Sequence, residues 1–290
     1  MESSFAHTEA KVREIRQVKY DFTGDVVFIS GAARGQGRSH ALGFAAAGAN
    51  VVLLDTQGKL GSMYYGLATS EELDQTAADC RALGVKALAV TGDVRHSAEV
   101  EAAVNAAIAE FGKIDILICN AGIASLYEVS EMPEEAWDEL LDINLKGVFL
   151  CARHVVPHMI KAKSGKILFT GSIHCFTGVP GASHYVAAKH GVAGFAKALA
   201  LEVAPAGITV NYVCPTAVNT MMVEAMLDPR VPETFGERMV GLTGSWNQLQ
   251  EGAPPLEPIE ITQAMLWLAS DSAKFVTGAP LLVDAGFTAK

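Results

Sequence analysis

The 290-residue sequence contains few charged and few aromatic residues, and it lacks any long hydrophobic run. Charged residues make up 19% of the chain and aromatic residues 7%. No apolar stretch is long enough to cross a bilayer, and residues 1–20 lack the apolar centre of a signal peptide. We therefore expect neither membrane insertion nor export.

Cysteine is scarce, and its positions follow no pattern. The five cysteines are odd in number and show no C-x-x-C spacing: Cys80, Cys119, Cys151, Cys175 and Cys214. Such a distribution is typical of buried, reduced thiols and not of a disulfide framework or a zinc site. His154 and His158 lie four residues apart, but no carboxylate or third ligand accompanies them, so we expect no metal site. Together these features predict a cytoplasmic protein.

Basic residues are outnumbered by acidic ones, 22 to 32, which gives a formal net charge of −10. A surface of this charge repels phosphate backbones, so we expect no nucleic-acid partner. Half of the residues are hydrophobic, which is enough for a substantial core and excludes disorder over most of the chain.

Short apolar, β-branched runs alternate with stretches of helical periodicity. The expected strands are residues 26–29, 51–54, 87–90, 114–119, 167–169, 208–213 and 281–283. Helices are expected at residues 37–47, from Thr69 towards Leu83, at residues 100–111 and at residues 134–161. Thr69 with Glu72 indicates a capping box, and Pro133 suits the first turn of the fourth helix. This alternation predicts an α/β fold with a parallel sheet covered by helices on both faces.

The chain shows no internal repeat and no Pro/Ser-rich linker, so we expect one domain at residues 22–290 after an N-terminal arm at residues 1–21. Two segments interrupt the alternation of strands and helices: residues 56–68 and residues 216–257. Long irregular loops at the carboxyl ends of parallel strands are where ligands bind. We therefore expect an inserted loop at residues 56–68 and a substrate lid at residues 216–257.

A glycine-rich turn follows the first expected strand. Gly31, Gly35 and Gly37 have the spacing G-x-x-x-G-x-G, which differs from the G-x-G-x-x-G dinucleotide fingerprint. Glycines there allow backbone N–H groups to approach a pyrophosphate at the start of the next helix. A structural turn would explain the glycines alone, but their position between a strand and an Ala-rich helix favours phosphate binding.

Asp55 ends the second expected strand, 18 residues after Gly37. A carboxylate at this place can accept both hydroxyls of an adenosine ribose and would repel a 2′-phosphate. Arg34 favours NADP instead, but no basic residue stands at Thr56 to complete such a site. The expected cofactor is NAD, and the alternative for Asp55 is a solvent-exposed strand end.

Tyr185 and Lys189 lie four residues apart, on one face of an expected helix. A phenol has an ordinary pKa of about 10, too high for a base at neutral pH. A nearby ammonium together with a positively charged nicotinamide ring should lower that pKa, so the pair could move the proton of an alcohol or ketone. Ser172, just past the fifth strand, could hold the substrate oxygen, or it could simply cap a helix.

These motifs in this order resemble the short-chain dehydrogenases/reductases, in their compact single-domain branch, from about Phe22 to the C-terminus. The matching residues are Ser30, Gly31, Gly35, Gly37, Asp55, Asp93, Val94, Asn120, Ala121, Gly122, Asn144, Ser172, Tyr185, Lys189, Cys214, Pro215 and Thr216. The resemblance implies a Rossmann-type doubly wound sandwich with a seven-stranded parallel sheet. Ser30 in place of the usual Thr, and Cys214-Pro215-Thr216 in place of Asn-Pro-Gly, are departures from the family pattern.

The resemblance also implies roles for single residues. Asn144, Ser172, Tyr185 and Lys189 would be catalytic, with Asn144 holding a water in a proton relay. The implied NAD contacts are Gly31, Arg34, Gly35, Gln36, Gly37, Asp55, Asp93, Val94, Asn120, Ala121, Gly122, Tyr185, Lys189, Pro215, Val218 and Thr220. Asp93 and Val94 would meet the adenine, and Pro215, Val218 and Thr220 would fix the carboxamide. A homotetramer is the family's default assembly.

Within the family, the chain resembles a subgroup of carveol dehydrogenase-like and mycofactocin-dependent enzymes, in which an inserted loop covers a tightly held NAD and electrons pass to another carrier. Met63, Tyr64 and Tyr65 suit such a cover, although packing against a neighbouring subunit would also explain them. The expected lid holds Met221, Met222, Met226, Leu227, Phe235, Met239, Leu242 and Trp246. An apolar wall of this kind favours a cyclic secondary alcohol or its ketone, while ordinary packing is the alternative.

Two other functions share this fold. A non-catalytic NAD-binding scaffold would be expected to lack Tyr185, Lys189 or Ser172, and all three are present. An epimerase or dehydratase would carry the other glycine spacing and a larger substrate domain. His174 and His184 flank the catalytic residues, and we expect them to be polar neighbours with hydrogen-bond partners, not bases.

Overall fold

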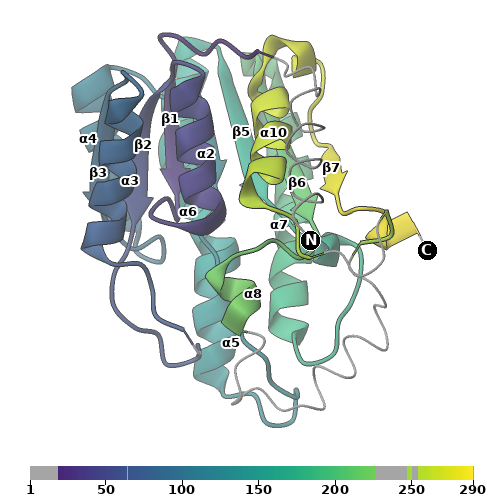
Figure 1. Cartoon of the computed structure of the whole chain (residues 1–290). Coiled ribbons are helices and arrows are strands. Elements are labelled where there is room, and N and C mark those ends of the chain that lie inside the picture. Colours follow the sequence, from purple (N-terminus) through teal and green to yellow (C-terminus); the bar gives the residue numbers. More distant parts are fainter. Residues whose placement is uncertain (1–18, 64, 226–246, 250–253, 290) are drawn as a thin grey trace, which may run out of the picture.

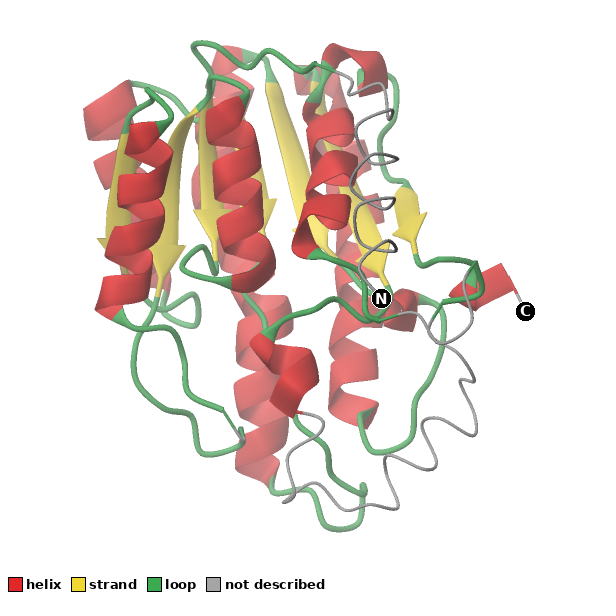
Figure 2. Cartoon of the chain, in the orientation of Figure 1, coloured by secondary structure: helices red, strands yellow, loops and turns green. Residues whose placement is uncertain are grey.

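The computed structural model describes residues 19–63, 65–225, 247–249 and 254–289. A seven-stranded sheet in the order β3-β2-β1-β4-β5-β6-β7 lies at its centre, and every strand pair is parallel. The strands are β1 (Val26–Ser30), β2 (Asn50–Asp55), β3 (Ala87–Thr91), β4 (Ile116–Cys119), β5 (Gly165–Thr170), β6 (Ile208–Pro215) and β7 (Pro280–Val283). Helices cover both faces (Figures 1 and 2). The expected Rossmann-type sandwich is confirmed, and each strand lies within two residues of its expected range.

The helices follow the strands in the expected alternation. They are α2 (Gly35–Ala46), α3 (Ser70–Ala82), α4 (Ser97–Phe111), α5 (Glu134–Leu141), α6 (Gly147–Ala162), α7 (Ser183–Val203), α8 (Met221–Ala225) and α10 (Pro258–Ala269). Short 3₁₀ turns occur at η2 (Ile173–Cys175), η3 (Ala204–Ala206), η4 (Asp271–Ala273) and η5 (Phe287–Ala289). The expected capping box is present: Thr69 Oγ1 accepts from Glu72 N, and Glu72 Oε2 accepts from Thr69 N at 2.8 Å.

The helix expected at residues 134–161 is present over residues 134–162, but it is not α-helical throughout. A π-helical turn, η1 (Asp142–Lys146), separates α5 from α6. A π turn takes an additional residue into the helix and is often found at functional sites. Pro133 is the N-cap of α5, so the helix begins directly after this proline, as expected.

Two hydrophobic cores lie on opposite faces of the sheet because alternate strand residues point in opposite directions. Phe28 packs with residues of α4, α6 and α7. Val27 and Ile29 pack with residues of α2, α3 and α10. The carboxyl ends of the parallel strands therefore meet along one edge between the two helical layers, as Figure 1 shows, and ligand sites of such sheets lie there.

The two expected loops are described to different extents. Residues 56–68 form an irregular excursion closed by a bridge between Gln57 and Ala68, with Tyr64 outside the described residues. In the expected lid at residues 216–257, Met221 and Met222 begin α8, and Val218 bridges to Leu256. Residues 1–18 of the expected arm and the other lid residues named above, Met226 to Trp246, lie outside the described residues.

All five cysteines are buried and carry free thiols, as expected. Within the described ranges, no helix is both long enough and apolar enough to cross a membrane.

Candidate active site

A cavity of about 370 Å³ opens where β1, β2, β3 and β4 end. Most of the residues expected to contact NAD line it: Gly31, Arg34, Gly35, Gln36, Asp55, Asp93, Val94, Asn120, Ala121, Gly122 and Thr220. Residues from four separate strand ends thus meet around one elongated space. A dinucleotide requires such a space because its adenosine and nicotinamide halves must be held together.

The glycine turn at the end of β1 leaves no room for side chains. A Cβ on Gly37 would lie 1.9 Å from the carbonyl oxygen of Gly31, and one on Gly31 would lie 2.7 Å from Ala121 Cα. Gly31 also has a φ of +65°, which favours glycine. The turn leads directly into α2, whose N-terminal N–H groups favour an anion. These residues fit the pyrophosphate of a dinucleotide.

Asp55 is held in place by the backbone. Its carboxylate accepts from Ala33 N and Thr56 N, both at 2.8 Å. Burial raises the pKa of Asp55, and the two backbone bonds act against that rise. Arg34 donates to the carbonyl of Gly66 and lies 3.9 Å from a Glu72 oxygen, so its guanidinium is engaged. A 2′-phosphate would meet the Asp55 and Glu72 carboxylates, which favours NAD over NADP.

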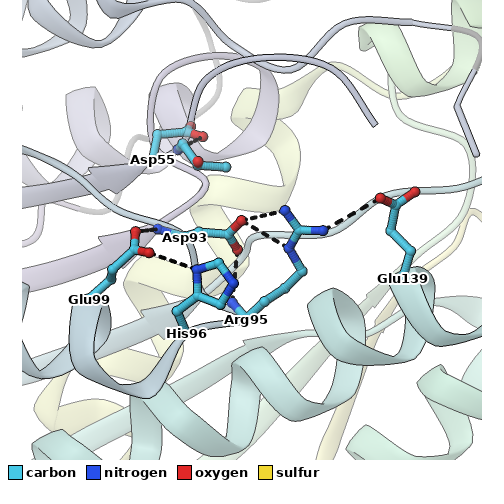
Figure 3. Close-up of polar contacts among 7 residues, drawn as sticks. Asp55, Asp93, Arg95, His96, Glu99 and Glu139 are labelled. Carbon is cyan, nitrogen blue, oxygen red and sulfur yellow. Dashed lines mark hydrogen bonds and ion pairs between the residues drawn. The ribbon is translucent and has the colours of Figure 1, made fainter. Parts of the chain in front are cut away.

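An ion-pair network surrounds Asp93 at the rim of this cavity (Figure 3). Arg95 donates to Asp93 Oδ2 through Nε at 2.9 Å and Nη2 at 2.6 Å, and its Nη1 lies 3.4 Å from Glu139. Burial raises the pKa of Asp93, but the bonds from Arg95 outweigh it and hold that pKa below its ordinary value. Glu139 also accepts from Ser62 N at 3.3 Å. The inserted loop is thereby fastened to α5 through Glu139, a contact that sequence patterns did not indicate.

A second cavity, of about 250 Å³, adjoins the first. It is lined by the expected catalytic residues Asn144, Ser172, Tyr185 and Lys189 and by Pro215 and Val218. Gln36, Asn120, Gly122, Thr220 and Met222 line both cavities. A cofactor in the first cavity would therefore share a boundary with a substrate in the second.

Tyr185 and Lys189 lie close together in the first turns of α7. Lys189 Nζ is 5.5 Å from the Tyr185 ring centroid and donates to the Thr170 carbonyl at 2.7 Å. Burial raises the pKa of Tyr185 to about 12, and its hydrogen bond with Ser172 lowers it. Burial also lowers the pKa of Lys189. The sequence predicts that a nearby ammonium lowers the pKa of the phenol. Without a bound cofactor the Tyr185 pKa is nevertheless raised, because the effect of burial is larger.

Ser172 and Asn144 are both fixed by backbone contacts. Ser172 caps η2, because its Oγ accepts from His174 N at 3.1 Å, while its hydroxyl also meets the Tyr185 phenol. The Asn144 side chain accepts from Ile123 N and donates to Ile123 O, both at 2.8 Å. The π turn that carries Asn144 is thus joined to the segment after β4. The water that the family resemblance implies at Asn144 stays a prediction.

Two further features lie close to the catalytic residues: a neutral histidine and a pair of buried thiols. Burial lowers the pKa of His174 to about 4, so this histidine is neutral at pH 7 where its ring meets that of Tyr185 edge-on. Cys175 and Cys214 form a buried thiol pair, and both sulfurs lie within 3.1 Å of the place that a Cβ on Gly171 would take. Cys214 lies near the end of β6 and is fully buried, in agreement with the buried thiols that the sequence predicts.

No group of three or more His, Cys, Asp or Glu side chains in the described part of the chain could hold a metal ion. His154 Nε2 instead lies 2.9 Å from Ser97 Oγ.

The chain is similar to known proteins in both its sequence and its fold. The family model of the short chain dehydrogenases matches residues 25–230. The chain is 40% identical to "(-)-trans-carveol dehydrogenase" of Rhodococcus erythropolis, over 92% of this chain and 98% of that protein. It is 37% identical to "cyclopentanol dehydrogenase" of Comamonas testosteroni, over 91% of this chain and 97% of that protein. The crystal structure of carveol dehydrogenase from Mycobacterium avium in complex with NAD superposes with a TM-score of 0.86 at 34% identity, covering 93% of this chain and 100% of that one.

Proposed function

This chain belongs to the short-chain dehydrogenase family, and on that premise we propose that it interconverts an apolar, cyclic secondary alcohol and its ketone with NAD. The observation that carries the proposal is the pair of adjoining cavities, one lined by the glycine turn and Asp55, the other by Ser172, Tyr185 and Lys189. Two relatives named for cyclic alcohols, carveol and cyclopentanol, support this substrate class.

The chain's own residues would supply the proton chemistry. NAD, when bound, supplies the site that accepts or returns a hydride. Ser172, whose hydroxyl meets the Tyr185 phenol before a substrate binds, would donate its hydrogen bond to the substrate oxygen once the substrate is in place. Tyr185 would take the hydroxyl proton during oxidation or return it during reduction. Lys189, buried and held by the Thr170 carbonyl, places a positive charge beside the phenol and favours its ionised form. Asn144 would hold the water through which the proton leaves.

Replacing the proposed base tests this assignment. Tyr185→Phe removes only the phenol oxygen, so turnover should fall by about 10³-fold, the size of a general acid–base contribution. NAD affinity, measured by calorimetry, should stay close to that of the unaltered protein, because the cofactor cavity keeps its lining. Undiminished turnover in this variant would remove Tyr185 from the mechanism.

A second candidate is a mycofactocin-type dehydrogenase that keeps its NAD and passes electrons to a redox carrier. The inserted loop supports this second candidate, because several hydrogen bonds hold the loop beside the cofactor cavity. Tyr127 donates to the Ser62 carbonyl at 3.4 Å, Ala124 N donates to the Tyr65 hydroxyl at 3.4 Å, and Arg34 holds Gly66. A non-catalytic NAD-binding scaffold has less support, because such a protein does not require Ser172 and Tyr185 to lie side by side.

One experiment separates these candidates. The purified protein is denatured and its supernatant analysed for released NAD, and a panel of cyclic alcohols is then assayed with free NAD and with an artificial electron acceptor. An ordinary dehydrogenase releases little NAD and turns over with free NAD. Retained NAD together with dependence on the acceptor supports the mycofactocin-type enzyme, and the absence of turnover in both assays supports the scaffold.

Two further proposals concern the protein as a whole. We propose a homotetramer, which exposed apolar side chains on α6 support, among them Phe149 and Ile160. We also propose that the protein works in the cytoplasm, where five reduced thiols are stable.

A further inference from the structure

One polar pair in the substrate cavity has no part in the proton chemistry described above. Ser125, in the segment after β4, lines the cavity and is 3% exposed. Its Oγ lies 2.9 Å from Nε2 of His184, which directly precedes Tyr185 in the first turn of α7. The two residues that flank Ser125 in the sequence, Ala124 and Leu126, also line the cavity and are apolar. A hydroxyl can both accept and donate a hydrogen bond, so the bond with His184 uses only part of the capacity of Ser125.

The hydrogen-bonding pattern of His184 indicates which way the hydroxyl points. His184 is fully buried, and burial lowers its pKa, so the ring is neutral and carries one N–H. Its Nδ1 is buried and meets no partner among the residues that the structure describes. A hydrogen on Nδ1 would be an orphaned buried donor, and such donors are rare. We therefore assign the hydrogen to Nε2, which donates to Ser125 Oγ.

This assignment leaves the hydrogen of the Ser125 hydroxyl free for the cavity. Oγ accepts from His184, and no other partner of Oγ is found among the described residues. His184 and Tyr185 are consecutive on a helix, so their side chains point about 100° apart. The Ser125 donor therefore reaches the cavity from a different side than the Tyr185 phenol, and it is suited to a different substrate atom.

Resting on the proposed alcohol dehydrogenase function, we propose that Ser125, positioned by His184, donates a hydrogen bond to a second oxygen of the substrate. The preferred substrates are then cyclic diols, hydroxyketones or diketones, in which one oxygen reacts between Ser172 and Tyr185 and the other is bound by Ser125. His184 acts as a positioning residue, since it meets the substrate only through the serine.

The test compares cyclohexanol with cyclohexane-1,2-diol, -1,3-diol and -1,4-diol in the full-length protein with NAD and an electron acceptor. The ratio of kcat/KM for the best diol to that for cyclohexanol should exceed one. Ser125→Ala should lower this ratio about fivefold, the value of one neutral hydrogen bond, and Ser125→Thr, which keeps the hydroxyl, should restore most of it. His184→Leu should lower the ratio, and His184→Gln, which keeps an N–H donor, should restore part of it. Ser97→Ala, on the surface of α4, is the matched control.

The same ratio in Ser125→Ala as in the unaltered protein overturns this proposal and leaves the dehydrogenase function intact. Failure of the unaltered protein to turn over any alcohol overturns the proposed function instead. In that case, calorimetry on the NAD-loaded protein tests the role of Ser125. The same measurement replaces the kinetic assay if a variant is unstable during turnover. Ser125→Ala should weaken binding of cyclohexane-1,4-dione about fivefold more than binding of cyclohexanone, and equal weakening of both contradicts the proposal.

Discussion

At the scale of single residues, Tyr185 is placed where burial opposes its proposed task. A phenol with a pKa of about 12 gives up its proton less readily than one in water. Three contacts can offset this: the Ser172 hydroxyl, the Lys189 charge and the positive ring of the oxidised cofactor. Of these three, the Ser172 hydroxyl is hydrogen-bonded to the phenol, and this bond lowers the Tyr185 pKa.

Removing the Ser172 hydroxyl should therefore shift the pH profile. Alcohol oxidation requires the phenolate, so its kcat/KM rises with pH until Tyr185 is ionised. In Ser172→Ala the rise should move to higher pH by about one unit, since a hydrogen bond to a charged group contributes about 1.5 kcal/mol. Ketone reduction needs the phenol, and its decline at high pH should move in the same direction. Profiles measured in both directions check this, with Ser97→Ala as control, and an unmoved midpoint would contradict the role given to Ser172.

Gly37 offers a second test at this scale. A methyl group there would collide with the Gly31 carbonyl, so Gly37→Ala must displace the glycine turn. The expected result is a loss of NAD affinity of about tenfold or more, equivalent to an overpacking cost above about 1.4 kcal/mol. Gly194→Ala, in the helix α7 where a methyl group meets nothing within 4 Å, should leave the affinity unchanged. Calorimetric titration with NAD measures both variants.

At the scale of secondary structure elements, the packing of α2 against α10 depends on a buried histidine. His40 is fully buried, and its Nδ1 lies 2.8 Å from Thr262 Oγ1, which itself donates to the Pro258 carbonyl. Because Thr262 donates its hydrogen to Pro258, we assign the hydrogen of the neutral His40 ring to Nδ1. Its Nε2 meets no partner among the described residues, so protonation would put an unpaired charge between the helices. Burial accordingly lowers the His40 pKa to about 3.

Acid should weaken the fold through this contact. The unfolded chain binds a proton at His40 with a pKa of about 6.5 and the folded chain only near 3, so stability is lost as the pH falls through that window. The loss at pH 5 is about 2 kcal/mol. In His40→Gln, the change in unfolding free energy between pH 7 and pH 5, measured with urea, should be smaller by about that amount. His190→Gln, at an exposed position, should retain the dependence of the unaltered protein.

Local patterns predicted most elements, because strand periodicity, the capping box at Thr69 and the glycine turn depend on neighbours in the sequence. The π turn at Asp142–Lys146 was missed, since its sequence contains neither glycine nor proline and its stabilising bonds reach Ile123, about twenty residues away. The pairs Arg95 with Glu139 and Ser125 with His184 join residues more than forty positions apart. Only the folded sheet brings such pairs together, so no local signal could have indicated them.

At the scale of the whole molecule, the outer face of α6 exposes large apolar side chains. Phe149, Arg153, Pro157 and Ile160 are exposed and recur at helical spacing on one face, with Phe149 42% and Ile160 47% exposed. Phe149 also contacts Phe195 of α7 edge-on, which extends the surface onto the next helix. Large exposed apolar patches mark interaction surfaces, and a second copy of the chain fits the proposed homotetramer.

A charge on this face should disrupt the assembly. Phe149→Glu is expected to yield dimers or monomers in sedimentation velocity experiments, because a buried unpaired carboxylate is costly at an apolar interface. Leu83→Glu, at the exposed end of α3, is the matched control and should keep the size of the unaltered protein. An unchanged sedimentation coefficient in Phe149→Glu would show that α6 does not form the contact.

The π turn between α5 and α6 also fixes the direction in which the side chains of α6 point about the helix axis, relative to those of α5. One residue more or less in a helix turns everything beyond it by about 100°. Deleting a single residue from Asp142–Lys146 would therefore pull Asn144 away from Ile123 and, at the same time, swing Phe149 and Ile160 away from the surface that they now share. The length of this turn therefore fixes both the proposed proton path and the proposed assembly face, and insertions or deletions in it should be tolerated far less well than substitutions.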